Sequence, residues 1–129
     1  MFLDANIFIN AFWRNDLSGQ KCREYLRRIR WQEHATTSPL VISEVIFVLK
    51  ENKGEEFALK TARNILKIQN LKILDINKIS CDYAIDYVTN GLDPKDAFHA
   101  ALMKQNGIKT ICSYDRDFDE ISEIKRKEP

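Results

Sequence analysis

The sequence predicts a single α/β domain with a mainly parallel sheet, and two features of the chain indicate this fold. Short apolar segments alternate with longer segments of helical spacing, which is the pattern of strands joined by crossover helices. The 129 residues, 44% of them hydrophobic and 30% charged, suffice for one core, and no repeat or linker divides them. We therefore expect one domain over residues 1–129.

Five short apolar segments are the predicted strands. They lie at residues 1–3, 35–37, 71–74, 109–113 and, as a last edge strand, 124–127. The first of them stops at Asp4. In a parallel sheet of this kind, chemistry collects beyond the carboxyl ends of the strands.

The segments between the strands have helical spacing or helix-end signals. Predicted helices cover 6–13, 18–31, 39–50, 55–69, 79–88 and 95–105, with a short helix in the turn over 113–121. Ser18 can cap the second helix. Ser38-Pro39 and Asp93-Pro94 each place a capping residue before a proline at the first helical position, and Asn106-Gly107 ends the last long helix.

The charge balance excludes several classes of protein. With 20 basic and 19 acidic residues the net charge is +1, so bulk charge does not hold the protein to nucleic acid or to a membrane. No apolar run approaches the roughly 18 residues that cross a bilayer. The first residues also lack the basic region of a signal peptide. We expect a cytoplasmic protein with no membrane contact.

Cysteine and histidine usage limits the kinds of metal site. The three cysteines are widely spaced and contain no C-x-x-C pair, so a disulfide framework or a zinc site is not expected. The two histidines are too few for a histidine-rich centre. Any metal would therefore be held by oxygen ligands.

Glu44 is the most informative acidic residue. It lies in the segment PLVISEVIFVLK, where apolar residues surround it on nearly every helical face. A helix that is apolar all round is buried, and a buried carboxylate is costly unless it is paired or binds a metal. The alternative is that Glu44 lies on a single solvated stripe near Lys50 and Glu51.

Three further acids each have a structural explanation. Asp4 can cap the first helix, Asp96 suits the first turn of a helix that Asp93 caps, and Asp115 can cap the turn RDFDE. Their joint placement is what indicates a site. In a parallel sheet these positions and Glu44 fall at the same edge, and clustered like charges repel unless a cation joins them. Hard divalent ions such as Mg²⁺ or Mn²⁺ suit such an oxygen site.

The residues around these acids resemble a known family. LDANIFI with Asp4 and Asn6, SEV around Glu44, KDAFHAAL around Asp96, and SYDRDF with Asp115 resemble, in order, the four motifs of PIN-domain nucleases. The size and the order of elements are most similar to small VapC-type toxins. The resemblance covers essentially the whole chain.

The resemblance implies a fold and an activity. The fold would be a three-layer α/β/α sandwich with a mainly parallel sheet of four to five strands. The activity would be that of an Mg²⁺- or Mn²⁺-dependent endoribonuclease that leaves a 5′-phosphate and a 3′-hydroxyl. Asp4, Asp96 and Asp115 would be metal ligands, and Glu44 either a ligand or the group that deprotonates the attacking water.

Further residues match less uniform features of the family. Asn6 and Ser113 match secondary polar positions, and Asp117 matches an auxiliary acid. His99 lies three residues after Asp96 on the same helical face, and we interpret it as a packed or supporting histidine.

Partners are implied in the same way. VapC-like proteins form homodimers and are blocked by a small antitoxin whose tail enters the acidic groove. The apolar first helix is a candidate for cover by another subunit. For RNA, the residues Arg23, Arg27 and Arg30 form one basic helical face that can contact phosphates, although a solvated face is the alternative.

Other functions are consistent with parts of the sequence. A signalling receiver would need an adjacent acidic pair after the first strand and a lysine after a later one, whereas Asp4 stands alone and Ser113 takes the later position. A non-catalytic module of the same fold that binds RNA or protein is a second alternative. A nuclease of RNA maturation rather than a toxin is a third.

Overall fold

The computed structural model describes all 129 residues and contains every predicted element. The strands are β1 (Phe2–Leu3), β2 (Ala35–Thr37), β3 (Leu71–Ile73), β4 (Thr110–Cys112) and β5 (Lys125–Lys127). The helices are α1 (Ala5–Trp13), α2 (Leu17–Gln32), α3 (Pro39–Lys53), α4 (Glu55–Leu66), α5 (Lys78–Thr89) and α6 (Pro94–Gln105), with the 3-10 helix η1 (Arg116–Glu120). The largest differences from prediction are at the ends of α3 and α4.

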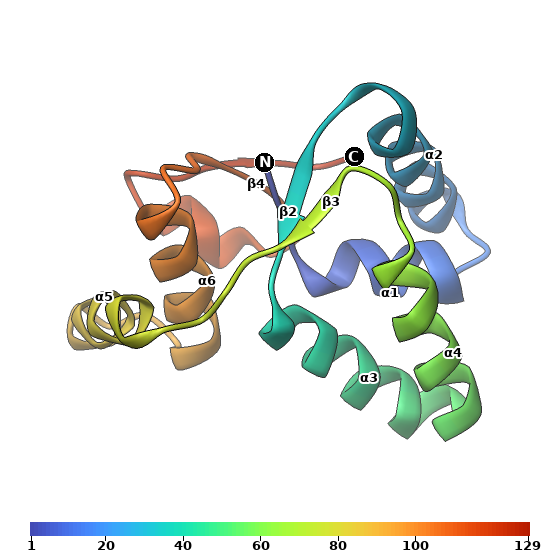
Figure 1. The fold of residues 1–129 in the computed structure, drawn as a ribbon, viewed down its shortest axis with the longest axis horizontal. Helices are drawn as coiled ribbons and strands as arrows, with labels where there is room; N and C mark the ends of the chain where they lie inside the picture. Colours follow the sequence, from blue (N-terminus) through green and yellow to red (C-terminus); the bar gives the residue numbers. More distant parts are fainter.

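The sheet has five strands in the order β3-β2-β1-β4-β5, and every neighbouring pair is parallel. Figure 1 shows α5 and α6 on one side of the sheet and α1 to α4 on the other. The predicted three-layer α/β/α sandwich is therefore confirmed, with five strands. The two residues of β1, Phe2 and Leu3, are fully buried at the centre of the sheet.

The strand order places a switch point between β1 and β4. The chain leaves β1 in one direction to form β2 and β3, and it then crosses back to form β4 on the other side of β1. The chain therefore leaves β1 toward one face of the sheet and β4 toward the other. This opens a crevice beyond the carboxyl ends of these two strands. Asp4 directly follows β1 and Ser113 directly follows β4, so the first polar residues after both strands lie in this crevice.

Most of the predicted helix caps are present. Asp4, Ser38, Asp93 and Asp115 each cap the element that follows, and Pro94 is the first residue of α6. The predicted cap of α2 is wrong: Asp16, not Ser18, caps this helix, because its carboxylate accepts from the Gly19 backbone N–H at 3.0 Å.

Helix α3 is less buried than its composition predicts. Its fully buried residues lie on one stripe, at Val41, Val45 and Leu49, whereas Phe47 on the opposite side is 67% exposed. The prediction that this helix is buried all round is wrong, because α3 packs on α1 and α4 and has no element over its outer face. Glu44 lies between the two faces, with its side chain 22% exposed.

The apolar surface of α1 is covered by the chain itself. Ala5, Ile7, Phe8 and Ala11 are buried, the remaining residues of α1 are partly buried, and α2 and α3 pack on this helix. Cover of α1 by another subunit stays a prediction and is limited to its partly exposed apolar side chains, Ile9, Phe12 and Trp13. The exposed large apolar side chains lie elsewhere, at Leu17, Trp31, Phe47, Leu66, Ile79, Ile85 and Val88.

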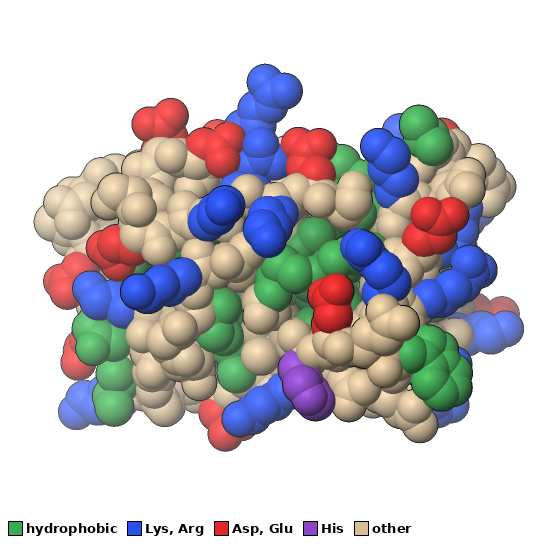
Figure 2. Space-filling view, turned by 90° about the horizontal axis from the view of Figure 1, so that it is seen from above, with side chains coloured by type: hydrophobic (Ala, Val, Ile, Leu, Met, Phe, Trp, Pro, Cys, Tyr) green, Lys and Arg blue, Asp and Glu red, His purple; other side chains and the backbone are tan.

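The surface has no region dominated by one charge on the face where the chain begins and ends. Figure 2 shows lysine and arginine side chains interspersed with acidic ones across this face. None of the helices has both the length and the apolar composition needed to span a bilayer. The three cysteines are free, in agreement with the predicted absence of disulfides.

Helix α2 crosses the end of α1 at a distance that only glycine permits. A Cβ atom on Gly19 would overlap the backbone oxygen of Arg14 and lie 2.9 Å from that of Asn10. We expect Gly19→Ala to lower the free energy of unfolding by about 1–3 kcal/mol, because backbone atoms have to move. Urea denaturation checks this, with Lys21→Ala, at an exposed position of the same helix, as control. Equal stability of Gly19→Ala and wild type would contradict the close approach.

Candidate active site

Asp4 is held at the centre of the crevice by side chains from two strand ends. Its Oδ2 accepts from Ser113 Oγ at 2.6 Å and from Asn6 Nδ2 at 2.7 Å, while its Oδ1 accepts from the Ala5 backbone N–H at 2.7 Å. The carboxylate is almost fully buried. Burial raises its pKa above the usual value, and the hydrogen bond from Ser113 offsets part of this rise.

The same network joins the ends of β1 and β4. Asn6 Nδ2 also donates to Ser113 Oγ at 3.0 Å, and Asn6 Oδ1 accepts from the Tyr114 backbone N–H at 3.2 Å. Ser113 Oγ accepts from the Asp115 backbone N–H at 2.9 Å. The two secondary polar residues predicted from sequence therefore position Asp4 and set the path of the chain toward Asp115.

Glu44 reaches the crevice from the first turns of α3. Its Oε1 accepts from Lys95 Nζ at 3.0 Å, and its Oε2 is buried without a hydrogen-bond partner. Burial alone would raise the pKa of Glu44, but His99 and Lys95 outweigh it and hold this pKa below its usual value. Neither alternative from the sequence is complete: Glu44 lies at the edge of a buried face and pairs with α6, not with Lys50 or Glu51.

Asp96 lies in the first turn of α6 and is buried, although it is a charged residue. Its Oδ1 has no hydrogen-bond partner. Burial is the main cause that raises its pKa to about 6, with Lys95 lowering it and the charges of Asp115 and Asp4 raising it further. A favourable interaction with the helix dipole alone does not require such burial.

Asp115 and Asp117 approach Asp96 from the turn after β4. Asp115 caps η1 by accepting from the Asp117 backbone N–H at 2.9 Å. One oxygen of each of the three aspartates lies within 4.8 Å of the others. A cavity of about 380 Å³ opens beside them between α5, α6 and η1, and Asp96 and Asp117 form part of its wall.

The potential metal ligands therefore form two groups. Asp4, Glu44 and His99 form one, again with ligand atoms within 4.8 Å of one another, and Asp96, Asp115 and Asp117 form the other. The four acids predicted from sequence are split between the groups, and Asp117 joins the second. Lys95 is the residue that sequence reasoning did not assign, and its only signal was its place beside Asp96. His99, interpreted from the sequence as a packed or supporting histidine, is fully buried and also faces Asp4 and Glu44.

The chemistry of these groups fits a divalent cation. Four buried side-chain atoms of the chain have no hydrogen-bond partner, and all four belong to these two groups. They are Glu44 Oε2, Asp96 Oδ1 and both ring nitrogens of His99. Such atoms are costly in a folded protein, by about 1–3 kcal/mol each. Carboxylate oxygens and imidazole nitrogens are also the atoms that bind divalent cations.

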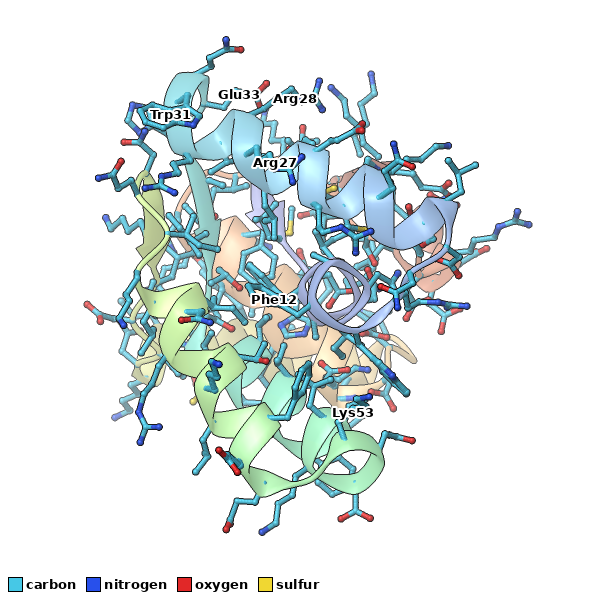
Figure 3. The ribbon with its side chains drawn as sticks, turned by 90° about the vertical axis from the view of Figure 1, so that its right-hand side faces the viewer. Phe12, Arg27, Arg28, Trp31, Glu33 and Lys53 are labelled. Carbon is cyan, nitrogen blue, oxygen red and sulfur yellow. The ribbon has the colours of Figure 1, made fainter.

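The predicted basic face is only partly available to a ligand. Arg23 donates to the backbone oxygens of Ala11 at 3.0 Å and Arg14 at 2.7 Å. Its guanidinium therefore satisfies carbonyl groups at the C-terminal end of α1. Arg27 and Arg30 line a groove of about 410 Å³ between α2 and α4, together with Leu26, Asn64, Lys67 and Ile68. Figure 3 shows Phe12 between these two helices, at the base of this groove.

The fold and the site define an α/β protein with acidic residues gathered at the switch point of a parallel sheet. The model of the PIN domain family matches residues 1–124, and the chain belongs to this family. The resemblance inferred from the four motifs is therefore confirmed, and the family decides against a signalling receiver. No curated protein matches the chain by sequence.

Several solved structures have the same fold, and they include VapC toxins of toxin–antitoxin systems. VapC20 from Mycobacterium tuberculosis, a toxin described as cleaving the sarcin–ricin loop, is 17% identical, with a TM-score of 0.76 over 94% of each chain. VapBC2 from Rickettsia felis, bound to promoter DNA, is 16% identical, with a TM-score of 0.76 over 98% of this chain and 96% of that one. A toxin–antitoxin complex from Klebsiella pneumoniae is 18% identical, with a TM-score of 0.71 over 99% and 98%.

The raised pKa of Asp96 gives a testable stability profile. A raised pKa means that the folded protein holds the proton more tightly than the unfolded chain, so the stability gained from protonated Asp96 is complete below about pH 4 and is lost as the pH rises through about 6. In EDTA at pH 7.5, Asp96→Asn should therefore melt a few degrees above wild type, and this advantage should shrink at pH 4.5.

Asp82→Asn, on the exposed side of α5, is the control and should leave the melting temperature unchanged at both pH values. Destabilisation of Asp96→Asn at pH 7.5 in EDTA would contradict this account and assign Asp96 a purely structural role in the helix.

Proposed function

We propose that this protein is a divalent-metal-dependent endoribonuclease and that it is the toxin of a VapBC-type toxin–antitoxin pair. The observation that carries the proposal is the set of buried, unpartnered ligand atoms gathered at the switch point of the sheet. Membership of the PIN domain family supports nuclease chemistry. The fold shared with VapC toxins supports the toxin role and an RNA substrate.

The roles of the acids follow from their positions. Asp4, Glu44, Asp96 and Asp115 would hold one or two Mg²⁺ or Mn²⁺ ions, with Asp117 as an additional ligand. When bound, such an ion stabilises charge on the phosphoryl oxygens and makes water a nucleophile near neutral pH. Asn6 and Ser113 fix the orientation of Asp4 through their hydrogen bonds to Oδ2.

If Glu44 is not itself a ligand, its role is to orient and deprotonate the attacking water. Lys95 and His99 keep its carboxylate ionised, and its Oε1 faces the more exposed side of the crevice, where Lys95 Nζ binds it. Burial alone would lower the pKa of Lys95, but Glu44 raises it, so the lysine stays cationic beside the site. This cation reduces the repulsion between the acidic site and an approaching phosphodiester.

The proposed partners follow from the same role. An antitoxin segment with an arginine would satisfy the acidic groups by charge-assisted, bidentate hydrogen bonds. A homodimer would cover part of the exposed apolar surface, and the neighbouring Ile85 and Val88 of α5 are candidates for that contact. A cytoplasmic location is part of the proposal, because the RNA target and the antitoxin would be found there.

The nuclease proposal is tested with the purified protein and with both structured and single-stranded RNA. We expect cleavage with Mg²⁺ or Mn²⁺, none with EDTA, and a loss of at least about 100-fold in Asp96→Asn, because one ligand oxygen is removed. Gel analysis of end-labelled RNA measures this, and the 5′-phosphate of the product is checked with a phosphate-dependent exonuclease.

Asp82→Asn is the matched control and should cleave as wild type does. If a protein that is folded and binds Mn²⁺ leaves every RNA intact even after denaturing purification has removed any bound inhibitor, the nuclease proposal fails and the non-catalytic module is favoured.

The groove between α2 and α4 is proposed to hold RNA phosphates through Arg27 and Arg30. The double variant Arg27→Ala/Arg30→Ala should weaken RNA binding about 10-fold and reduce the slope of log affinity against log salt by about one to two. RNA binding is measured by fluorescence anisotropy. All variants also carry Asp96→Asn, which prevents cleavage during the measurement. Lys109→Ala, in an exposed turn, is the control. An unchanged salt dependence would show that this face is only solvated.

A further inference from the structure

His99 has surroundings that packing alone does not explain. It is fully buried on α6, and its ring lies between Phe2 and Phe118, with centroid separations of 5.5 Å and 6.4 Å. Neither ring nitrogen has a hydrogen-bond partner. A buried polar group without a partner is destabilising, and an apolar side chain at this position would avoid that cost.

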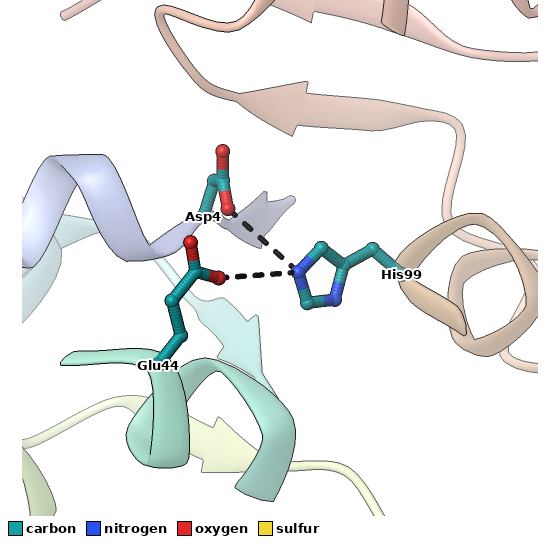
Figure 4. Close-up of side chains that lie close together, drawn as sticks. All are labelled: Asp4, Glu44 and His99. Carbon is teal, nitrogen blue, oxygen red and sulfur yellow. Dashed lines mark ion pairs between the residues drawn. The ribbon is translucent and has the colours of Figure 1, made fainter. Parts of the chain in front are cut away.

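The ring is oriented so that one nitrogen faces two carboxylates. Figure 4 shows this nitrogen, Nε2, facing both acids. Nε2 lies 3.8 Å from Asp4 Oδ1 and 3.9 Å from Glu44 Oε2. These separations exceed the reach of a hydrogen bond, which is about 2.7–3.2 Å for N–H···O. Hydrogen bonds to these acids therefore do not account for the arrangement, and only a protonated ring would form ion pairs with the two carboxylates across these distances.

The same three atoms are close enough for one metal ion to bridge them. Two ligand atoms that each lie about 2.1 Å from a six-coordinate ion are about 3.0 Å apart when adjacent and about 4.2 Å apart when opposite. The separations from Nε2 to the two oxygens are wider than the adjacent spacing and shorter than the opposite one, so an ion bound here would draw the two carboxylates closer to the ring.

We propose that His99 Nε2 is a metal ligand, and that with Asp4 and Glu44 it forms a mixed nitrogen–oxygen site that prefers first-row transition ions such as Mn²⁺ to Mg²⁺. Imidazole nitrogen favours transition ions, whereas Mg²⁺ prefers oxygen ligands. Asp96, Asp115 and Asp117 form an oxygen-only group, which has no such preference. The inference rests on the proposed function, because it concerns the same site.

The phenylalanines beside His99 make the site rigid. Phe2 belongs to the central strand and Phe118 to η1, and both are fully buried. They restrict the ring to one plane, so the nitrogen is held toward Asp4 and Glu44 before an ion arrives. A preorganised ligand of this kind loses little entropy on binding.

The test uses the full chain with less than one equivalent of Mn²⁺, so that the tighter site fills first. Pulsed electron paramagnetic resonance should detect a nitrogen coupled to Mn²⁺, and the coupling should change when the histidines are labelled with ¹⁵N. His34 is the other histidine of the chain and is exposed. His34→Gln should therefore keep the coupling, and this comparison needs no change at His99.

The variant His99→Phe removes the ligand but keeps an aromatic ring between Phe2 and Phe118. We expect it to lose the nitrogen coupling and to lower the preference for Mn²⁺ over Mg²⁺ about 10- to 100-fold in competition titrations. Without metal it should melt no lower than wild type, because two unpartnered nitrogens are removed. A lower melting temperature with an unchanged ion preference would overturn the proposal and assign His99 a structural role.

The remaining outcomes separate this inference from the nuclease proposal. Metal-dependent RNA cleavage by a wild-type protein whose bound Mn²⁺ has only oxygen ligands would overturn the assignment of His99 and leave the nuclease intact. A wild-type protein that binds neither Mn²⁺ nor Mg²⁺ and cleaves no RNA would overturn both.

Discussion

The structure depends on the hydrogen bonds that join Asp4 to the ends of the two central strands. β1 is only two residues long, and its register with β4 is continued beyond the strand by Asp4, Asn6 and Ser113. The same bonds that hold the sheet together at its switch point hold a buried carboxylate in a fixed orientation. Fold and site therefore share this set of contacts, so a change at Asp4 alters both.

Each acid has a local structural role as well as a place in the site, and this explains why single residues were ambiguous in the sequence. Asp4 and Asp115 are caps, and Asp96 lies in a first helical turn. In Asp4 the capping oxygen Oδ1 is also the one that faces His99, while Oδ2 accepts from Ser113 and Asn6. Oδ1 of Asp96 is buried without a partner, which a place in a first helical turn does not require. The local role therefore positions each side chain and still leaves acceptor capacity for the chemistry.

The sequence predicted the fold well because its signals are local. Short apolar strands, Ser38-Pro39 and Asp93-Pro94 each specify an element without knowledge of the rest, and the parallel arrangement follows from their alternation. The predictions that failed depend on tertiary contacts. Whether Phe47 is exposed depends on which helices lie over it, and whether Ser18 or Asp16 caps α2 depends on where the chain turns. The sequence indicated a packed or supporting role for His99, but not its place beside Asp4 and Glu44, because these residues are distant in sequence.

The protonation of the acids links metal binding to the site's own stability. Burial raises the pKa of Asp4 and brings that of Asp96 to about 6, whereas Lys95 and His99 hold that of Glu44 below its usual value. Without a cation, the two deeper acids hold their protons to a higher pH than exposed aspartates do, while Glu44 stays charged, so repulsion within the site is reduced at mildly acidic pH. A cation must displace those protons, which makes its affinity fall as the pH falls. The absence of the ion therefore costs the fold least at mildly acidic pH and most near neutral pH, where Asp96 is ionised.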